Sequence, residues 1–184
     1  MDDGGQAAGE DWLLLVYRVP SEPSRLRSAV WRRLKSLGAI YLQNSAAALP
    51  ASVGAERALR KLRSEIVAMP GSAVLLSCRV LAGAADVHQA FQAARDDEYE
   101  EIVDRCQDFL EQVKKEHAAR HFTFAELEEN EVDLVKLQNW FARVRQRDAF
   151  GAAGRPTAEQ ALAECEQALE GYATRVYEEE PDSH

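Results

Sequence analysis

The chain has 184 residues, of which 46% are hydrophobic and 29% are charged, and its formal net charge is −9. This composition is that of an ordinary globular protein, and the length provides for one sizeable domain or two small ones. The longest strongly apolar run, WLLLV at 12–16, is too short to cross a membrane, and the acidic start MDDGGQAAGED lacks the apolar run of a secretory signal.

The first predicted elements form an α/β domain over residues 12–82, preceded by a disordered acidic tail at 1–11. The apolar run WLLLVYRVP at 12–20 suits a buried central strand. A helix follows, for which we expect Ser21 or Ser24 as the cap and Gly38 as the stop. Its apolar side chains recur at helical spacing: Leu26, Val30, Leu34 and Leu37.

Two short strands, AIYLQNS and AAALP, are predicted next, around a turn near Asn44 and Ser45. A second helix, GAERALRKLRSEIVAM, ends at Pro70–Gly71, and SAVLLSCRVL is the fourth strand. The buried stripe of the second helix is Leu59, Leu62, Ile66 and Met69. The order β-α-β-β-α-β predicts a ferredoxin-like arrangement, in which one antiparallel sheet carries both helices on one face.

Residues 83–178 are predicted to form an antiparallel three-helix bundle, which makes the fold class α+β. Thr123 has the capping-box spacing to Glu126 at the start of the second of these helices, and Thr157 is the expected cap of the third. We expect residues 179–184 to be frayed. The predicted buried positions are Tyr99, Ile102, Val103, Cys106, Phe109, Leu110, Val113, Leu127, Leu134, Leu137, Phe141, Val144, Leu162, Cys165, Leu169, Tyr172 and Val176.

Charge is divided unevenly along the chain. Residues 12–80 hold eleven basic and three acidic side chains, whereas residues 81–184 hold eleven basic and 24 acidic ones. Such asymmetry indicates either two functional surfaces or two halves that attract each other. The segment SRLRSAVWRRLKSLGA at 24–39 has five basic residues and no acidic one.

The outer faces of the two early helices are therefore predicted to form one basic surface. Three interpretations remain open: a solvated helix face, contact with the acidic half of the chain, and a surface that binds phosphates. Trp31 lies on the flank of the first helix, where two roles are open: it packs on a sugar of the DNA, or it completes the edge of the core, which we favour. The predicted nucleic-acid-binding residues are Arg25, Arg27, Arg32, Arg33, Lys35, Arg57, Arg60 and Lys61.

No catalytic motif is complete. GAAGRP at 151–156 lacks the Lys and the Ser or Thr of a phosphate-binding loop, and no serine has the context of a nucleophile elbow. His117 and His121 have metal-ligand spacing but straddle a predicted helix break. The acids between Asp96 and Asp104, with Glu128 and Glu131, have the chemistry of a hard-cation site, although such runs are usually solvated faces. We expect no enzyme, no metal and no cofactor.

The cysteines Cys78, Cys106 and Cys165 are far apart, odd in number and without metal-ligand spacing. They indicate reduced thiols, packed as small hydrophobic side chains in a cytoplasmic protein.

The chain resembles the N-terminal region of the chromate-resistance regulator ChrB. The resemblance lies in WLLLVYRVPSEPSRLRSAVWRRLKSLGAIYLQ and continues through RDDEYEEIVDRCQDFL, HFTFAELEENEVDLVKLQNWFARVRQRDAFGA and ALEGYATRVYE. It implies a bacterial cytoplasmic protein tied to chromate-responsive transcription, which binds DNA as a homodimer. The larger regulators carry a further C-terminal domain associated with the chromate response; this sequence ends without it and is expected to be a stand-alone relative.

A strand followed by a proline and a basic helix is also similar to the dimeric ferredoxin-like domains of PaaX-type regulators and of small CRISPR-associated nucleases. Those nucleases hold a metal with an Asp at the end of the first strand, where this chain has Tyr17–Arg18–Val19. Hydrolysis is therefore not expected. The leading hypothesis is a DNA-binding regulator; the alternative is an interaction or sensor module that binds an oxyanion such as chromate.

Overall fold

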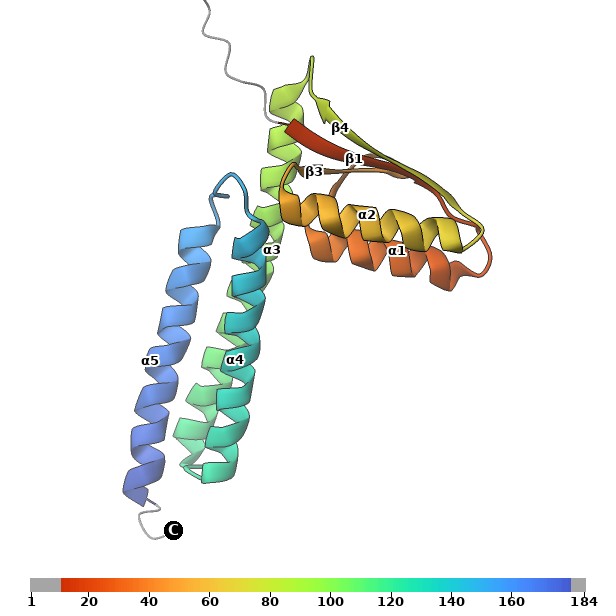
Figure 1. Cartoon of the computed structure of the whole chain (residues 1–184). Coiled ribbons are helices and arrows are strands. Elements are labelled where there is room, and N and C mark those ends of the chain that lie inside the picture. The colour runs from red at the N-terminus through yellow and green to blue at the C-terminus, as the bar shows by residue number, and fades with distance from the viewer. Residues whose placement is uncertain (1–10, 180–184) are drawn as a thin grey trace, which may run out of the picture. The chain divides into compact units, whose positions relative to one another are not determined.

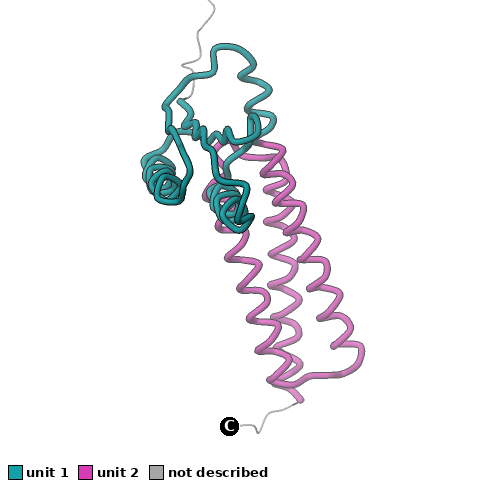
Figure 2. Tube along the Cα trace, turned by 90° about the vertical axis from the view of Figure 1, so that its right-hand side faces the viewer, with its two compact units in different colours: residues 1–91 teal, residues 92–184 magenta. Residues whose placement is uncertain are grey.

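The structure is a computed structural model that describes residues 11–179. It divides into two compact units, residues 1–91 and residues 92–184 (Figure 2). This division falls within a helix, after the predicted domain boundary at 82–83. The tails expected at 1–11 and 179–184 lie mostly outside the described residues; Asp11 opens the first strand and Glu179 closes the last helix.

The first unit contains a four-stranded sheet and two helices, as the sequence predicts. The strand order is β2-β3-β1-β4, and every neighbouring pair is antiparallel. Figure 1 shows both helices on one face of this sheet. The fold is therefore ferredoxin-like, with the elements β1 (Asp11–Arg18), α1 (Ser24–Leu37), β2 (Ile40–Gln43), β3 (Ala46–Pro50), α2 (Val53–Ala68) and β4 (Ser72–Arg79).

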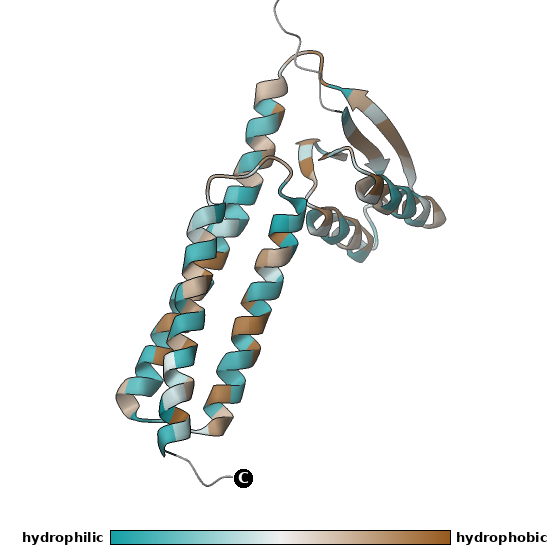
Figure 3. Cartoon of the chain, turned by 60° about the vertical axis from the view of Figure 1, so that its left-hand side comes forward, coloured by the Kyte–Doolittle hydropathy of each residue, from teal (hydrophilic) through white to brown (hydrophobic). Residues whose placement is uncertain are grey.

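The core of this unit lies between the sheet and the helix pair. Side chains of a strand alternate between its two faces, so Leu13 and Leu15 of β1 point the same way. Both are buried, and they face the apolar stripes of the helices. Figure 3 shows the corresponding pattern of mostly hydrophobic strands and striped helices. The buried helix residues are Val30, Leu34, Leu59, Leu62 and Ile66.

The opposite face of the sheet is also apolar, and it is open only in part. Ala48 and Ile40 are buried on this face, and the Trp12 ring packs edge-on against Phe91 with the ring centroids 6.0 Å apart. Phe91 belongs to the first turns of α3 (Ala84–Ala119), which lie in the first unit. Val74 and Leu76 of β4 are 56% and 44% exposed on this face.

The ends of α1 and α2 follow local backbone chemistry. Gly38 adopts a left-handed conformation (φ 78°) beyond α1, and its N–H bonds back to the helix, as predicted. The predicted serine cap of α1 is wrong: the helix begins at Ser24, and Pro23 holds the cap position with no side-chain bond. In α2 the Ser52 hydroxyl accepts a hydrogen bond from the Ala55 N–H at 3.1 Å.

The second unit consists of α4 (Phe124–Arg147), α5 (Arg155–Glu179) and the greater part of α3. Figures 1 and 2 show them packed as an antiparallel bundle. Its core contains buried Tyr99, Phe141 and Tyr172, and Thr123 caps α4 as predicted, accepting from the Glu126 N–H at 3.3 Å. Thr157 caps no helix, because α5 already begins at Arg155.

An aspartate closes the connection between α4 and α5. The Asp148 carboxylate accepts hydrogen bonds from the N–H groups of Gly151 (3.0 Å) and Ala152 (3.1 Å) and from the Tyr99 hydroxyl (3.2 Å). Burial and this neighbouring carboxylate raise the pKa of Tyr99. These bonds account for the early start of α5, because they order the residues that composition assigned to a loop.

One polar group lies among the apolar contacts between α3 and α4. The Glu116 side chain is buried and accepts hydrogen bonds at 2.6 Å from the side-chain amides of Asn130 and Gln112. Asn130 is itself only 4% exposed. The carboxylate is thus supplied with donors, as a buried charge requires.

Candidate nucleic-acid interface

The predicted basic residues of α1 are all exposed. Arg25, Arg32 and Lys35 lie opposite the stripe of Val30 and Leu34, because each residue turns about 100° around the helix. The helix contains no acidic residue. Within the part of the chain that the structure describes, no carboxylate lies within ion-pair distance of these three side chains. Their charge is therefore not neutralised by described residues.

Trp31 lies on one flank of this basic surface and is half exposed, at 50%. The Lys35 ammonium stands over its ring, 5.5 Å from the centroid. A shallow hollow of about 360 Å³ beside the ring is lined by Ser24, Arg27, Ser28 and Trp31. The prediction that Trp31 completes the core edge is wrong, since the ring is available to a flat apolar ligand group.

On the other flank of α1, the two helices bring basic residues together. Arg33 of α1 and Lys61 of α2 line the same hollow of about 230 Å³, where Glu65 of α2 is also present. Arg57 lies one turn before Lys61 on α2 and is exposed. The predicted continuity of the basic surface from α1 to α2 therefore depends on Arg33, Arg57 and Lys61.

Arg60 differs from the other predicted residues. Its guanidinium is held by Glu56, with the Nε atom 2.7 Å from the carboxylate, and it lines a groove on the β4 side of α2. Arg63 lines the same groove and was not among the predicted residues. The spacing of three residues between Arg60 and Arg63 was the signal for this second basic edge. The helices thus present two basic regions and not one.

Three of the acids and histidines considered for a metal make other contacts in the second unit. The Asp96 carboxylate accepts from the Gly154 N–H at 2.7 Å, and Glu98 pairs with Arg95 and Arg147. The His117 ring packs edge-on against Phe122 at 5.0 Å. Within residues 11–179, no three His, Cys, Asp or Glu side chains come close enough together to bind one metal ion.

Burial limits what the cysteines can do. Cys106 and Cys165 are fully buried in the bundle, and the Cys165 thiol lies 3.5 Å from the Cys106 carbonyl oxygen. The interaction between the two thiols raises the pKa of Cys165, and both remain free. None of the described helices combines the length and apolarity needed to span a membrane.

Comparison with known proteins places these features in a family. A family model described as "Protein ChrB, N-terminal" matches residues 27–183. Protein ChrB of Cupriavidus metallidurans is 31% identical to this chain over 109 residues. That alignment covers 59% of this chain and 31% of the relative, so it spans about a third of the relative's length. The family match includes α2, the bundle and α1 from Arg27 onward, so Arg25 lies outside it.

Proposed function

Because the chain belongs to the ChrB N-terminal family, we propose that it is a DNA-binding regulatory protein in which α1 contacts phosphates. The family confirms the sequence resemblance, and with it the relation to chromate resistance. The proposal adds two points to the family assignment: the partner is DNA, and the contact surface is the outer face of α1. It rests on the charge and exposure of one helix.

The observation that carries the proposal is the unneutralised outer face of α1. Arg25, Arg32 and Lys35 project from a helix without acids, in a chain whose overall charge is −9. Surface helices ordinarily mix both signs of charge, so a purely basic face indicates an anionic partner. DNA phosphates attract such faces, because binding releases condensed counterions.

The test is the charge-reversal triple variant Arg25→Glu, Arg32→Glu and Lys35→Glu. Gel retardation of a mixed-sequence duplex at low salt is expected for the native protein and not for the variant. The three side chains are exposed, so the melting temperature is expected to stay within a few degrees. In a salt series, each lost phosphate contact reduces the slope of log K against log salt by about 0.9. Absence of retardation by the native protein would contradict the proposal.

A second candidate function is oxyanion binding, which the hollow between Arg33 and Lys61 favours. Its two cations, on facing helices, match a tetrahedral oxyanion such as chromate, and Glu65 in the same hollow reduces the net charge there to +1. Calorimetry with chromate and with sulfate tests this role: a heat that disappears in Arg33→Ala with Lys61→Ala supports it. Equal heats in the native protein and the double variant would exclude this hollow.

The proposed role has further requirements. We expect the protein to bind DNA as a homodimer. A role in DNA binding also requires that the protein be located in the bacterial cytoplasm. It needs no catalytic step. β1 ends with Tyr17 and Arg18, so the metal-binding Asp of the similar nucleases has no counterpart there.

A further inference from the structure

The strand β4 leaves one of its backbone edges without a partner strand. It lies at the end of the sheet and pairs only with β1 among the described residues, in a continuous register over all eight of its residues. It contains no proline, and its only charged residue, Arg79, is its last. Long and regular edges of this kind pair readily with another extended strand. The β4 edge is therefore a candidate interface.

The edge formed by β2, at the other end of the sheet, is protected. β2 has only four residues, and its register against β3 shifts between Tyr41 and Gln43. Short strands and irregular pairing both discourage the addition of a strand. Pairing of β4 with β4 of a second copy leaves only the two protected β2 edges at the outside of the joined sheet. An unrelated strand would instead become a new open edge, so the arrangement of the sheet favours a second copy.

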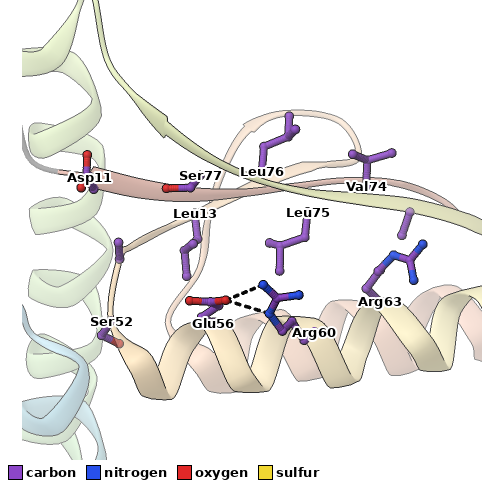
Figure 4. A pocket seen from close by; sticks show the side chains of 12 residues that line it. Asp11, Leu13, Ser52, Glu56, Arg60, Arg63, Val74, Leu75, Leu76 and Ser77 are labelled. Carbon is purple, nitrogen blue, oxygen red and sulfur yellow. Dashed lines mark hydrogen bonds and ion pairs between the residues drawn. The ribbon is translucent and has the colours of Figure 1, made fainter.

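The groove between β4 and α2 has as many acidic as basic side chains, and they lie at different positions along it. Its charged residues are Asp11 and Glu56, with Arg60 and Arg63. Figure 4 shows Asp11 and Glu56 towards one end of the groove and Arg63 towards the other end, below Val74. A second copy related by a rotation of 180° presents the same groove in the reverse direction. The basic end of each copy then meets the acidic end of the other.

The flank of α2 beside this groove has a pattern that matches its own reverse. Glu56 lies four residues before Arg60, and Arg63 lies three residues after it. Val53 and Val67 each lie seven residues from Arg60, and they are 77% and 48% exposed. Residues at these spacings share one side of a helix. Two such flanks packed antiparallel therefore place Val53 beside Val67 of the second copy, and Glu56 beside its Arg63.

The Glu56 carboxylate has room for a second cation. The Nε and Nη2 atoms of Arg60 both lie 2.7 Å from the same oxygen atom of Glu56, Oε1. Within residues 11–179, the Oε2 atom has no partner, and Arg63 forms no ion pair. A carboxylate accepts hydrogen bonds at both of its oxygens. Arg63 of a second copy can thus bind Oε2 while Arg60 keeps Oε1, and Arg60 stays neutralised by its own chain.

We propose that the chain forms a twofold dimer in which β4 pairs antiparallel with β4 of a second copy. The axis passes at Leu75, which lies across the groove from Arg60 in Figure 4. Val74 of each copy then lies opposite Leu76 of the other, as an apolar cross-strand pair on the open face of one eight-stranded sheet. Both copies carry their helices on the same face of that sheet. This interface goes beyond the proposed function, because it depends on β4 and α2 and not on DNA.

Two charge-reversal variants test the interface by analytical ultracentrifugation of the full chain without DNA. The native protein is expected to show a dimer whose amount rises with concentration. Arg63→Glu sets two acids against each other across the axis, and Glu56→Arg sets two bases, so each is expected to weaken dimerisation by about tenfold or more. An equal mixture of the two variants is expected to form a dimer again, because the acidic flank of one then meets the basic flank of the other. A misfolded variant cannot give this recovery.

The matched control is Lys114→Glu, which makes the same change of charge at an exposed residue of the bundle and is expected to leave dimerisation unchanged. Hydrogen exchange then locates the interface: backbone amides of residues 72–79 are expected to exchange more slowly in the native dimer than in monomeric Arg63→Glu.

Four outcomes would overturn the proposal. They are a monomeric native protein, a dimer that both reversal variants retain, a variant mixture that stays monomeric, and a dimer whose β4 amides are not protected. Protected β4 amides in a monomer would place another segment, such as residues 1–10, on the edge and would also contradict a second copy. The measurements contain no DNA, so their failure is distinct from failure of the gel-retardation test.

Discussion

At the scale of single residues, Trp31 shows how one step along a helix changes the role of a large side chain. Its neighbour Val30 is 1% exposed in the core, whereas Trp31 is 50% exposed. A rotation of about 100° separates them. A half-exposed indole with Lys35 over its ring gains less stability from its position than a buried one, because about half of its area stays in water. The same position allows contact with a sugar or base.

We expect Trp31→Ala to weaken binding of single-stranded DNA by about fivefold or more, because stacking of an unpaired base on an aromatic ring contributes roughly 1–3 kcal/mol. Its effect on unfolding is expected to be small, within about 0.5 kcal/mol, as for other exposed substitutions. Titration by fluorescence anisotropy and thermal unfolding measure the two effects, with Trp31→Phe as the control that keeps a ring. A large loss of stability with unchanged DNA affinity would instead indicate a core residue.

At the scale of elements, the junction between α2 and β4 leaves no room for a side chain at Gly71. A Cβ atom on Gly71 would lie 2.7 Å from the Arg18 carbonyl oxygen and 2.8 Å from that of Ile66. Backbone atoms cannot move aside as a flexible side chain can. Gly71 therefore permits α2, β1 and β4 to meet closely, and the direction of the β4 edge depends on it.

Gly71→Ala is expected to destabilise the protein by about 1–3 kcal/mol, the usual cost of overpacking. Gly54→Ala is the matched control: it lies in the first turn of α2, and a Cβ there would meet nothing within 4 Å. The control is expected to be neutral or slightly stabilising, because alanine favours helix. Chemical denaturation of the two variants makes the comparison. Equal denaturation midpoints for the two variants would show that the junction accommodates the added Cβ atom without loss of stability.

At the scale of the whole molecule, basic and acidic side chains are concentrated in different parts of the chain. The basic residues of 12–80 exceed the acidic ones, while the complete chain has a net charge of −9. If α1 is the contact surface, local charge decides DNA affinity, because exposed charges beyond about 10 Å are largely screened. The net charge of the protein is then a poor guide to its binding.

Two double variants with the same change of net charge test this point. Arg25→Glu with Arg32→Glu is expected to reduce DNA affinity at least tenfold, since two phosphate contacts are lost. Lys114→Glu with Arg143→Glu changes exposed residues of the bundle and is expected to have an effect of less than about twofold. Both are measured by anisotropy at one salt concentration. Similar losses in the two variants would mean that total charge, and not α1, governs the affinity.

The order of elements was predictable because hydrophobic periodicity is a local property. Val30 and Leu34, or Leu134 and Phe141, define their buried stripes whatever else surrounds the helix. The functional surface was less predictable, because it depends on neighbours distant in sequence. Helical periodicity gives the direction in which Arg60 projects from α2. Only the fold shows that this side of α2 faces β4 and that Glu56 pairs with the Arg60 side chain. The exposure of the β4 edge likewise depends on strand order.

The buried Glu116 carboxylate has a consequence for how α3 and α4 align. The contacts between these helices are largely apolar, and apolar contacts are not directional as hydrogen bonds are. A slide of one helical turn removes Asn130 from Glu116 and leaves the buried carboxylate with the Gln112 amide of its own helix, a loss of about 1–3 kcal/mol. This single polar contact thereby selects one axial register among several that hydrophobic packing alone would permit.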